Sequence, residues 1–441
     1  MILNDTIVAP ATPSGGAIAI VRIEGPRAIE ICDSLFRGKR KVADMQGYSM
    51  MHGIIYDSER RVDDVVVSLY RSPHSYTGGD MVEIACHGSS YIVGEIVRLA
   101  IEQGARSATA GEFTKRAFLA GKIDLSQAEA VADIIAADSK TSLAMADTQL
   151  RGGYSALLGS LRGELLHLAA LLELELDFGE EDVEFAERDK LSSTLRDILK
   201  TISSLRGSFT TGNAIKRGIA VAIVGEPNVG KSTLLNRIVG DDRAMVSAIA
   251  GTTRDTIEEC VTIEGVVFRF IDTAGLHETG DQLENMGIER THRAIGEAQI
   301  VVELFDRPTD EHIVQPQEGQ RIISVLNKCD QHSLATPEGW ISISAKRGDG
   351  IERLLAELRQ MVDTNQIMNG EAVVSNTRHY EALGRAERAA ESALETLVAN
   401  ISTDLVAREI RDVLDAIGEI TGEVTTTDIL AEIFSKFCIG K

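Results

Sequence analysis

Residues 225–232, GEPNVGKS, contain the residue types that bind a nucleoside triphosphate. The stretch follows the apolar run AVAIV and precedes a helical pattern, so its glycines allow backbone N–H groups to surround phosphates at a helix N-terminus. Lys231 is expected to reach the terminal phosphates, and Ser232 is expected to ligate Mg²⁺. A glycine-rich turn without a ligand is the structural alternative, and the strand-loop-helix context disfavours it.

Two further motifs indicate which base is bound. VLNKCD follows another apolar run, and the Asp330 carboxylate can accept hydrogen bonds from N1–H and the exocyclic amine of guanine. Adenine offers no such pair of donors, so the sequence predicts GTP as the nucleotide. The base-binding residues predicted from VLNKCD and from ISISAK (341–346) are Asn327, Lys328, Asp330, Ser344, Ala345 and Lys346.

A fourth motif, FRFIDTAG, ends an apolar strand pattern with Asp272, placed to hold the metal, and Gly275, whose N–H faces the γ-phosphate. Small signalling GTPases have a water-orienting glutamine directly after this glycine, but Leu276 stands here. An apolar side chain cannot position water, so Glu284 in DQLENMGIER is the catalytic candidate. The alternative is that Glu284 is an exposed helix residue without a catalytic role.

Charge that develops during hydrolysis needs a cation, and no arginine finger is evident in the sequence. Oxygens of the segment SAIAGTTRD, together with Asn228 of the phosphate loop, are therefore predicted to hold a monovalent cation beside the phosphates. Thr253 is predicted to be the second Mg²⁺ ligand.

The elements that must position these motifs change along the chain. Short apolar runs separated by Gly, Pro and Asp predict a mixed α+β domain at the N-terminus. Helical patterns flank an alternating strand-helix block, which predicts an α/β domain inserted into a discontinuous helical domain. Ser126 and Glu129 are predicted to form a capping box at the start of a helix. The predicted domains are 1–118, 119–215, 216–374 and 375–441.

Composition excludes several classes of protein. The 441 residues are 44% hydrophobic and 25% charged, which is typical of soluble globular proteins. Neither a secretory signal nor an apolar stretch long enough to span a bilayer is evident, so a cytoplasmic protein without membrane contact is expected. The five cysteines lack CxxC spacing, which argues against a disulfide framework and a zinc site. A net charge of −22 disfavours general nucleic-acid binding, so any RNA contact must be local or come through a partner.

Arg22 and Glu83 are lone charges inside apolar strand patterns, where an unpaired charge is costly. They are expected either to pair with each other, to lie on an exposed strand edge, or to bind a ligand. The chain ends KFCIGK, which places Cys438 near the C-terminus. A prenylated cysteine is one interpretation, but the last residue, Lys441, does not fit that signal.

GEPNVGKS, SAIAGTTRD, DTAG, NKCD and FCIGK, together with NDTIVA and GEFTKRAFLAGKIDLSQAEA, give the whole chain a strong resemblance to the MnmE (TrmE) family of tRNA-modification GTPases. The resemblance implies an α+β folate-binding N-terminal domain that forms a homodimer, a discontinuous helical domain, and an inserted Ras-like P-loop GTPase domain with a doubly wound α/β sheet. It implies a K⁺-dependent GTPase.

The implied partner is the FAD-carrying protein MnmG (GidA), in a heterotetramer or larger complex. The implied product is a carboxymethylaminomethyl-type group at C5 of the wobble uridine (U34) of certain tRNAs. The carbon would come from a tetrahydrofolate derivative, in the 5-formyl or methylene form.

The resemblance also assigns residues. Glu284 would orient water, and Cys438 would lie near the transferred carbon unless it is a buried packing residue. Mg²⁺ would be held by Ser232 and Thr253, K⁺ by Asn228, Ser247, Ile249 and Thr252, and folate by Arg22, Glu83, Lys122 and Lys441. The GTP-binding residues before the base motifs would be Asn228, Val229, Gly230, Lys231, Ser232, Thr233, Ser247, Ile249, Gly251, Thr252, Thr253, Asp272, Thr273, Ala274 and Gly275.

One departure and two alternatives follow. The stretch FDRPTDEHIVQPQEGQR, between two predicted strands, is short, so the peripheral helix usual there is expected to be trimmed.

A regulatory GTPase that acts in ribosome assembly without folate chemistry is the alternative function. A membrane GTPase with lipid on Cys438 is the other.

Overall fold

A computed structural model describes residues 4–177, 188–240, 245–246, 258–271, 293–309, 311–317, 319–331 and 334–440. The chain forms two compact units, Met1–Ala132 with Gly418–Lys441, and Asp133–Ile417. The first unit therefore contains both ends of the chain. This division is coarser than the four segments predicted from the sequence, whose boundaries remain predictions.

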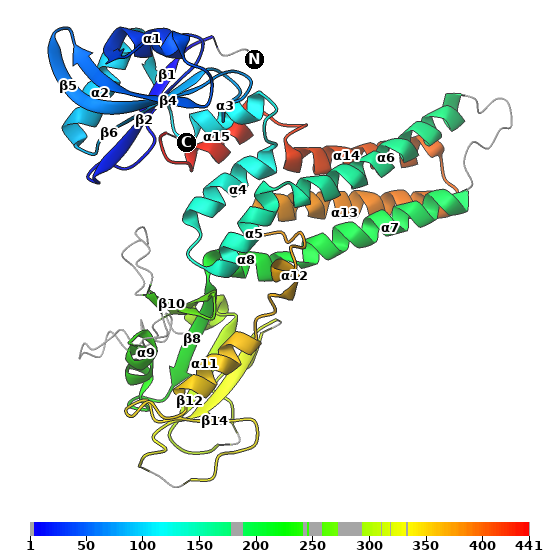
Figure 1. The fold of residues 1–441 in the computed structure, drawn as a ribbon. Helices are drawn as coiled ribbons and strands as arrows, with labels where there is room; N and C mark the ends of the chain where they lie inside the picture. The colour runs from blue at the N-terminus through cyan, green and yellow to red at the C-terminus, as the bar shows by residue number, and fades with distance from the viewer. Residues whose placement is uncertain are drawn as a thin grey trace, which may run out of the picture. The chain divides into compact units, whose positions relative to one another are not determined.

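The first unit is built on a seven-stranded sheet in the order β3-β4-β5-β6-β2-β1-β7. Alternation along the strands sends Val65, Val67 and Leu69 to one face, where they pack in a core with residues of α1 (Ala28–Leu35) and α2 (Ser90–Glu102). Figure 1 shows these two helices beside the sheet. The strands and the short 3₁₀ helix η1 are β1 (Ile7–Pro10), β2 (Ile18–Glu24), β3 (Phe36–Gly38), η1 (Val42–Asp44), β4 (Ser49–Asp57), β5 (Arg60–Tyr70), β6 (Met81–His87) and β7 (Arg106–Ser107).

Three helices complete this unit: α3 (Glu112–Leu119), α4 (Leu125–Ala136), which extends into the second unit, and α15 (Thr427–Ser435). Leu125 of α4 packs with Phe434 of α15 and with Phe437 in an apolar cluster. An isolated β-bridge between Ala110 and Ile439 then fixes the C-terminal tail beside α3. The tail therefore lies against the N-terminal domain.

The predicted capping box of Ser126 and Glu129 is wrong by two residues. The Asp124 carboxylate accepts a hydrogen bond from the Gln127 N–H at 2.8 Å, and the Gln127 side chain accepts one from the Asp124 N–H at 2.9 Å. Asp124 and Gln127 therefore cap α4, and Ser126 is a buried residue within the helix. Asp is as good an N-cap as Ser, so the pattern permitted both positions.

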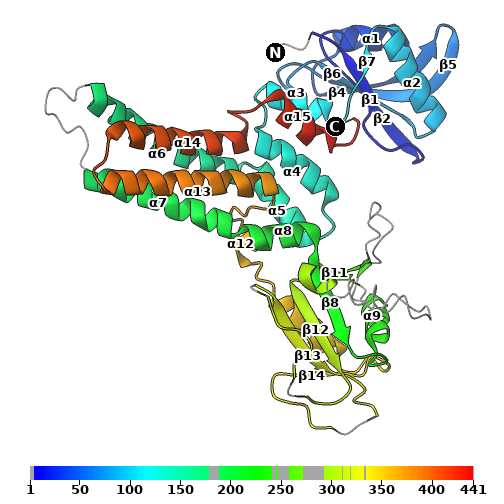
Figure 2. The same ribbon diagram turned by 180° about the vertical axis from the view of Figure 1, so that it is seen from behind.

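The second unit contains a helical part in which α6, α7 and α13 run side by side with α14 (Figures 1 and 2). Leucines of α6 spaced three and four residues apart are buried at Leu158, Leu161, Leu165, Leu168 and Leu172. The helices are α5 (Lys140–Leu150), α6 (Gly153–Asp177), α7 (Arg188–Gly207), α8 (Phe209–Arg217), α12 (Asn365–Met368), α13 (Thr377–Val398) and α14 (Thr403–Thr421).

One helix qualifies the sequence-based expectation about membranes. Within the described part of the chain, residues Gly153–Leu176 of α6 are long and apolar enough to cross a bilayer by length and composition alone. The exposed face of α6 carries Glu164, His167 and Glu173 beside three exposed leucines, while the five leucines named above are buried. We therefore interpret α6 as a helix of the bundle.

Between α8 and α12 the chain forms a second seven-stranded sheet, in the order β14-β13-β12-β8-β11-β10-β9. Its first five strands are mutually parallel, and β10 and β9 extend it in antiparallel fashion. The elements are β8 (Ile219–Gly225), α9 (Lys231–Val239), β9 (Met245–Val246), β10 (Glu258–Ile263), β11 (Val266–Ile271), β12 (Ile300–Phe305), β13 (Arg321–Leu326), β14 (Ile341–Ser342) and α11 (Ile351–Gln360). The predicted doubly wound α/β domain, inserted between helical segments, is confirmed.

Candidate functional sites

The phosphate loop connects the end of β8 to the start of α9. Gly230 has φ +109°, and a Cβ there would lie 2.4 Å from the Asn327 side-chain nitrogen, so only glycine fits. Asn228 also has a positive φ, of 62°. Between these two residues, Val229 is buried in the core of the domain. The buried Val229 side chain and the close approach of Gly230 to Asn327 therefore hold the loop in place.

The first turn of α9 presents Lys231, Ser232 and Thr233. The Lys231 ammonium donates hydrogen bonds to the carbonyl oxygens of Gly225 at 2.9 Å and Glu226 at 3.0 Å, so it curls over the loop. Ser232 and Thr233 are exposed. A helix N-terminus with its backbone N–H groups directed outward favours an anion, and a serine hydroxyl suits Mg²⁺, which prefers oxygen ligands.

Asn327 ties three loops together. It is buried, its side-chain nitrogen donates to the Val229 carbonyl at 2.8 Å, and its side-chain oxygen accepts from the Ala345 N–H at 3.0 Å. The base motifs and the phosphate loop therefore form one hydrogen-bonded structure.

Asp330 lies in the same group of loops. The Ser344 hydroxyl donates to its carboxylate at 2.7 Å, and this hydrogen bond lowers the pKa of Asp330. The carboxylate is thus an ionised acceptor at neutral pH, as recognition of guanine N–H groups requires. Lys328 has φ +64° and pairs with Asp306 at 3.3 Å.

Sequence reasoning missed Arg237, on the last turn of α9. Its guanidinium donates to the Ala345 carbonyl at 3.3 Å and the Lys346 carbonyl at 2.6 Å. The helix that carries Lys231 is therefore hydrogen-bonded directly to the ISISAK loop, which is predicted to bind the base. An arginine in a polar helix position gives no signal of this contact in the sequence.

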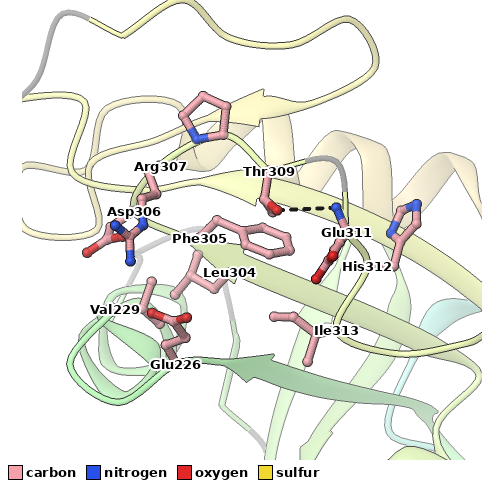
Figure 3. Close-up of a pocket in the computed structure, with 11 residues that line it drawn as sticks. Glu226, Val229, Leu304, Phe305, Asp306, Arg307, Thr309, Glu311, His312 and Ile313 are labelled. Atoms are coloured by element: carbon pink, nitrogen blue, oxygen red, sulfur yellow. Dashed lines mark hydrogen bonds between the residues drawn. The ribbon is translucent and has the colours of Figure 1, made fainter.

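The expectation of a trimmed helix after β12 is confirmed for the residues that the structure describes between 306 and 320, none of which is helical. Glu303, fully buried in β12, binds this segment by accepting hydrogen bonds from the Val314 N–H at 2.9 Å and pairing with His312 at 2.7 Å. A pocket of about 400 Å³ lies between the segment and the phosphate loop, with Phe305 from β12 and Val229 in its wall (Figure 3).

Several predicted site residues lie outside the described residues, and their roles stay predictions. These are Ser247, Ile249, Gly251, Thr252, Thr253, Asp272, Thr273, Ala274, Gly275, Glu284 and Lys441.

In the first unit, Arg22 and Glu83 lie on neighbouring strands and form an ion pair of 2.7 Å, with side chains 17% and 18% exposed. The pairing that the sequence left as an alternative is therefore confirmed. Glu83 also accepts a hydrogen bond from the Tyr70 hydroxyl at 3.3 Å. Burial, and then the nearby Glu83 carboxylate, raise the pKa of Tyr70, so the phenol remains a donor.

The C-terminal tail reaches this ion pair. Arg22 donates to the Gly440 carbonyl at 3.2 Å, and its guanidinium lies 5.3 Å from the ring centre of Phe113 on α3. Cys438 is exposed, so its interpretation as a buried packing residue is wrong. Its carbonyl accepts a hydrogen bond from the Gly111 N–H at 3.3 Å.

Within the described part of the chain, no hydrogen bond or ion pair joins Lys122 to this group. Its ammonium is exposed and donates to the Pro73 carbonyl at 3.1 Å. The structure thus brings together Arg22, Glu83 and the tail, whereas Lys122 interacts elsewhere in the same unit.

An open α/β sheet with a phosphate loop, and a buried asparagine that joins this loop to the loops of the NKCD and ISISAK motifs, define a GTP-binding protein. The domain is inserted in a helical protein whose two ends meet at one N-terminal sheet. Two family models match: MnmE helical domain over residues 125–438, and GTP-binding protein TrmE N-terminus over residues 6–122. The chain belongs to the MnmE family of tRNA modification GTPases, and it is a GTP-hydrolysing enzyme.

Full-length relatives support this assignment. The chain is 48% identical to the tRNA modification GTPase MnmE of Christiangramia forsetii, with 100% of both chains covered. It is 46% identical to the protein of the same name from Flavobacterium johnsoniae, again with 100% of both covered. Against the MnmE of Cytophaga hutchinsonii the identity is 44%, over 99% of this chain and 98% of the relative. The regulatory alternative in ribosome assembly is therefore set aside.

Proposed function

We propose that this GTPase works with the flavoprotein MnmG to add a carboxymethylaminomethyl-type group at C5 of U34 in certain tRNAs, using a tetrahydrofolate-derived carbon. The observation that carries the proposal is the contact of the C-terminal tail with Arg22 beside Glu83. Family membership supplies the link to tRNA modification.

We call Arg22, Glu83 and the C-terminal tail beside them the tail site. Its side chains suit the binding of a reduced folate. A carboxylate such as Glu83 can accept from the N–H edge of a pterin, and cations such as Arg22, Lys122 and Lys441 can bind the folate's glutamate carboxylate. Ligand binding would replace the Arg22–Glu83 pair, whose charges already lie side by side. The exposed Cys438 thiol would then lie close to the transferred carbon.

In the assembly we propose, the N-terminal domains form a homodimer, and MnmG joins it in a heterotetramer or larger complex in the cytoplasm. GTP would be held with Mg²⁺ on Ser232 and Thr253. K⁺ would be held by Asn228, Ser247, Ile249 and Thr252. Ordering of loops by the γ-phosphate is the physical means by which the GTP cycle would drive the modification.

Calorimetry with 5-formyl-tetrahydrofolate tests the folate site. The full chain should bind the ligand, and a chain that lacks the last four residues should bind it at least about tenfold more weakly, because Arg22 loses a neighbour and Lys441 is removed. Equal binding by both chains would remove the tail from the site. Mass analysis of wobble uridine, in tRNA from a deletion strain complemented with this gene, then tests the product.

The hydrolytic roles are tested separately. Glu284→Ala should abolish GTP turnover while GTP affinity stays unchanged, because the side chain is proposed to orient only the attacking water. Hydrolysis should be much faster in K⁺ than in Na⁺. Normal turnover by the variant would exclude Glu284, and equal rates in the two salts would exclude the cation site.

A further inference from the structure

The densest run of positive charge in this acidic chain lies where edge strand β3 ends. Arg37, Lys39, Arg40 and Lys41 occupy four of five successive positions in a protein whose net charge is −22. Lys39, Arg40 and Lys41 are exposed, and within the part of the chain that the structure describes they form no ion pair. We call residues 39–41 the basic loop.

The basic loop is anchored at both ends. Phe36 before it and Val42 after it are buried. The Asp33 carboxylate accepts hydrogen bonds from the Val42 and Ala43 N–H groups, which satisfies an acid that would otherwise compete for the cations. A loop fixed in this way presents its side chains at little further cost in backbone entropy.

Arg37 has a different role from the three cations that follow it. Its guanidinium lies 4.2 Å from the ring centre of Tyr56 and donates to the Ser58 carbonyl at 3.0 Å. Arg37 therefore holds β3 to the β4–β5 hairpin. The charged ends of Lys39, Arg40 and Lys41 face solvent.

The contrast with other arginines of the same unit is informative. Arg60 pairs with Glu95 and Asp57, and Arg61 pairs with Asp64. Arg98 pairs with Glu95, Asp57 and Glu102. Since acidic residues outnumber basic ones, paired arginines are the expected outcome. Three adjacent cations that have no acidic partner among the described residues are not explained by stability of the fold.

We propose that the basic loop is a docking surface for the phosphodiester backbone of tRNA, an inference that rests on the proposed function. Three cations on one fixed loop match the repeated negative charge of an RNA strand, and phosphate contacts position a substrate without reading its sequence. An anionic membrane is a weaker match, because stable membrane anchoring needs an apolar or lipid signal in addition to charge.

The test compares two triple variants of the full chain. Lys39→Ala/Arg40→Ala/Lys41→Ala removes the basic loop, and Lys190→Ala/Arg196→Ala/Lys200→Ala removes three exposed cations of α7, so both change the net charge from −22 by three units. Fluorescence anisotropy with labelled, unmodified tRNA over a range of salt concentrations gives the affinity. The loop variant should bind at least about tenfold more weakly, with a log-log salt slope less steep by about 2, while the α7 variant stays within about twofold of the unchanged chain.

Other outcomes are assigned in advance. If both triple variants bind tRNA equally more weakly, or if the loop variant binds tRNA as tightly as the unchanged chain, the inference is overturned and the proposed function is unaffected. No tRNA binding by the unchanged chain, alone or with its flavoprotein partner, overturns both. Loss of binding to phosphatidylserine vesicles with tRNA binding retained would show that the loop serves a membrane instead. Normal GTP turnover by each variant confirms that the second unit is folded, and unchanged hydrogen exchange of peptides from β2 and β6 confirms that the first unit, which carries the basic loop, is folded.

Discussion

The nucleotide site and the tail site are built in opposite ways. In the nucleotide site, the described residues of the phosphate and base motifs lie in loops that follow strands or in the first turn of α9, and Asn327 joins neighbouring loops through hydrogen bonds of 2.8 and 3.0 Å. In the tail site, Arg22 meets Gly440 across 418 positions of sequence. The first site is fixed by local chain geometry, and the second exists only once the two ends of the chain have docked.

The difference has a physical consequence for stability. The loops of the nucleotide site are attached to a buried parallel sheet. The tail is held by a few contacts: the Ala110–Ile439 bridge and the Gly111–Cys438 hydrogen bond just before α3, the Arg22–Gly440 hydrogen bond, and Phe437 in the apolar cluster. Segments held by few contacts open at a low free-energy cost. Ligand binding at the tail site should therefore be the more easily disrupted of the two activities.

The largest effect is expected for Asp330→Asn. An amide cannot replace a carboxylate as the acceptor of the two hydrogen bonds proposed from guanine, so GTP affinity should fall at least about 100-fold. Fluorescence titration with a labelled guanine nucleotide measures it. Affinity for 5-formyl-tetrahydrofolate should not change, because Asp330 and the tail belong to different units. Loss of folate binding as well would contradict the independence of the two sites.

Gly440→Ala should break the tail site alone. Gly440 has φ +100°, and a Cβ there would lie 1.9 Å from the Pro10 carbonyl oxygen, so the tail must move away from Arg22. We expect affinity for 5-formyl-tetrahydrofolate to fall about tenfold, measured by calorimetry, with normal GTP turnover. Gly15→Ala is the matched control, because Gly15 has φ +99° and no atom within 4 Å of the added Cβ. Similar losses in both variants would attribute the effect to backbone strain alone.

The same contrast explains what the sequence could predict. The motifs GEPNVGKS and VLNKCD are contiguous, and each follows an apolar run, so local patterns were enough to predict the strands and loops that position them. Arg22 and Glu83 gave only the signal of charges in apolar strands, which the structure resolves as an ion pair. Arg237 gave no signal, because its partners are backbone carbonyls more than 100 positions away. Contacts made by long side chains with distant backbone leave no local pattern.

A smaller effect is expected for Arg237→Ala, which sharpens the account of the nucleotide site. Loss of its hydrogen bonds to the Ala345 and Lys346 carbonyls should loosen the base loop while the phosphate loop keeps its own contacts. Because Arg237 is exposed, we expect guanine-nucleotide dissociation to accelerate only about fivefold, measured by displacement of a fluorescent analogue. Arg353→Ala on α11 removes an exposed arginine of the same domain and should leave the dissociation rate unchanged. Equal nucleotide dissociation rates for the two variants would show that the Arg237 hydrogen bonds do not contribute to nucleotide binding.

The smallest effect is expected from the pH dependence of Glu112 on α3, the helix beside the tail. Burial alone would raise the pKa of Glu112 on α3, but hydrogen bonds from Arg106 and from the Thr109 N–H lower it to about 2. A lowered carboxyl pKa stabilises the folded state above the unfolded value of about 4.3, and this contribution is lost as pH falls toward 2. The pKa of the neighbouring Glu24 is raised by burial, so its contribution has the opposite sign.

The free energy of unfolding of the first unit should therefore decline as the pH falls from 5 to 3. Glu112→Gln should lower this free energy at pH 5 and make its decline from pH 5 to pH 3 less steep. Glu24→Gln is the matched control in the same cluster, joined to Arg116 as Glu112 is, and should leave that decline at least as steep. Hydrogen exchange of peptides from β2 and α3 in urea reports on this unit, and fluorescence of Trp340, the single tryptophan, reports on the other. A flattened decline in the Trp340 signal as well would mean that the ion cluster stabilises the whole chain, and the two units would then not be independent.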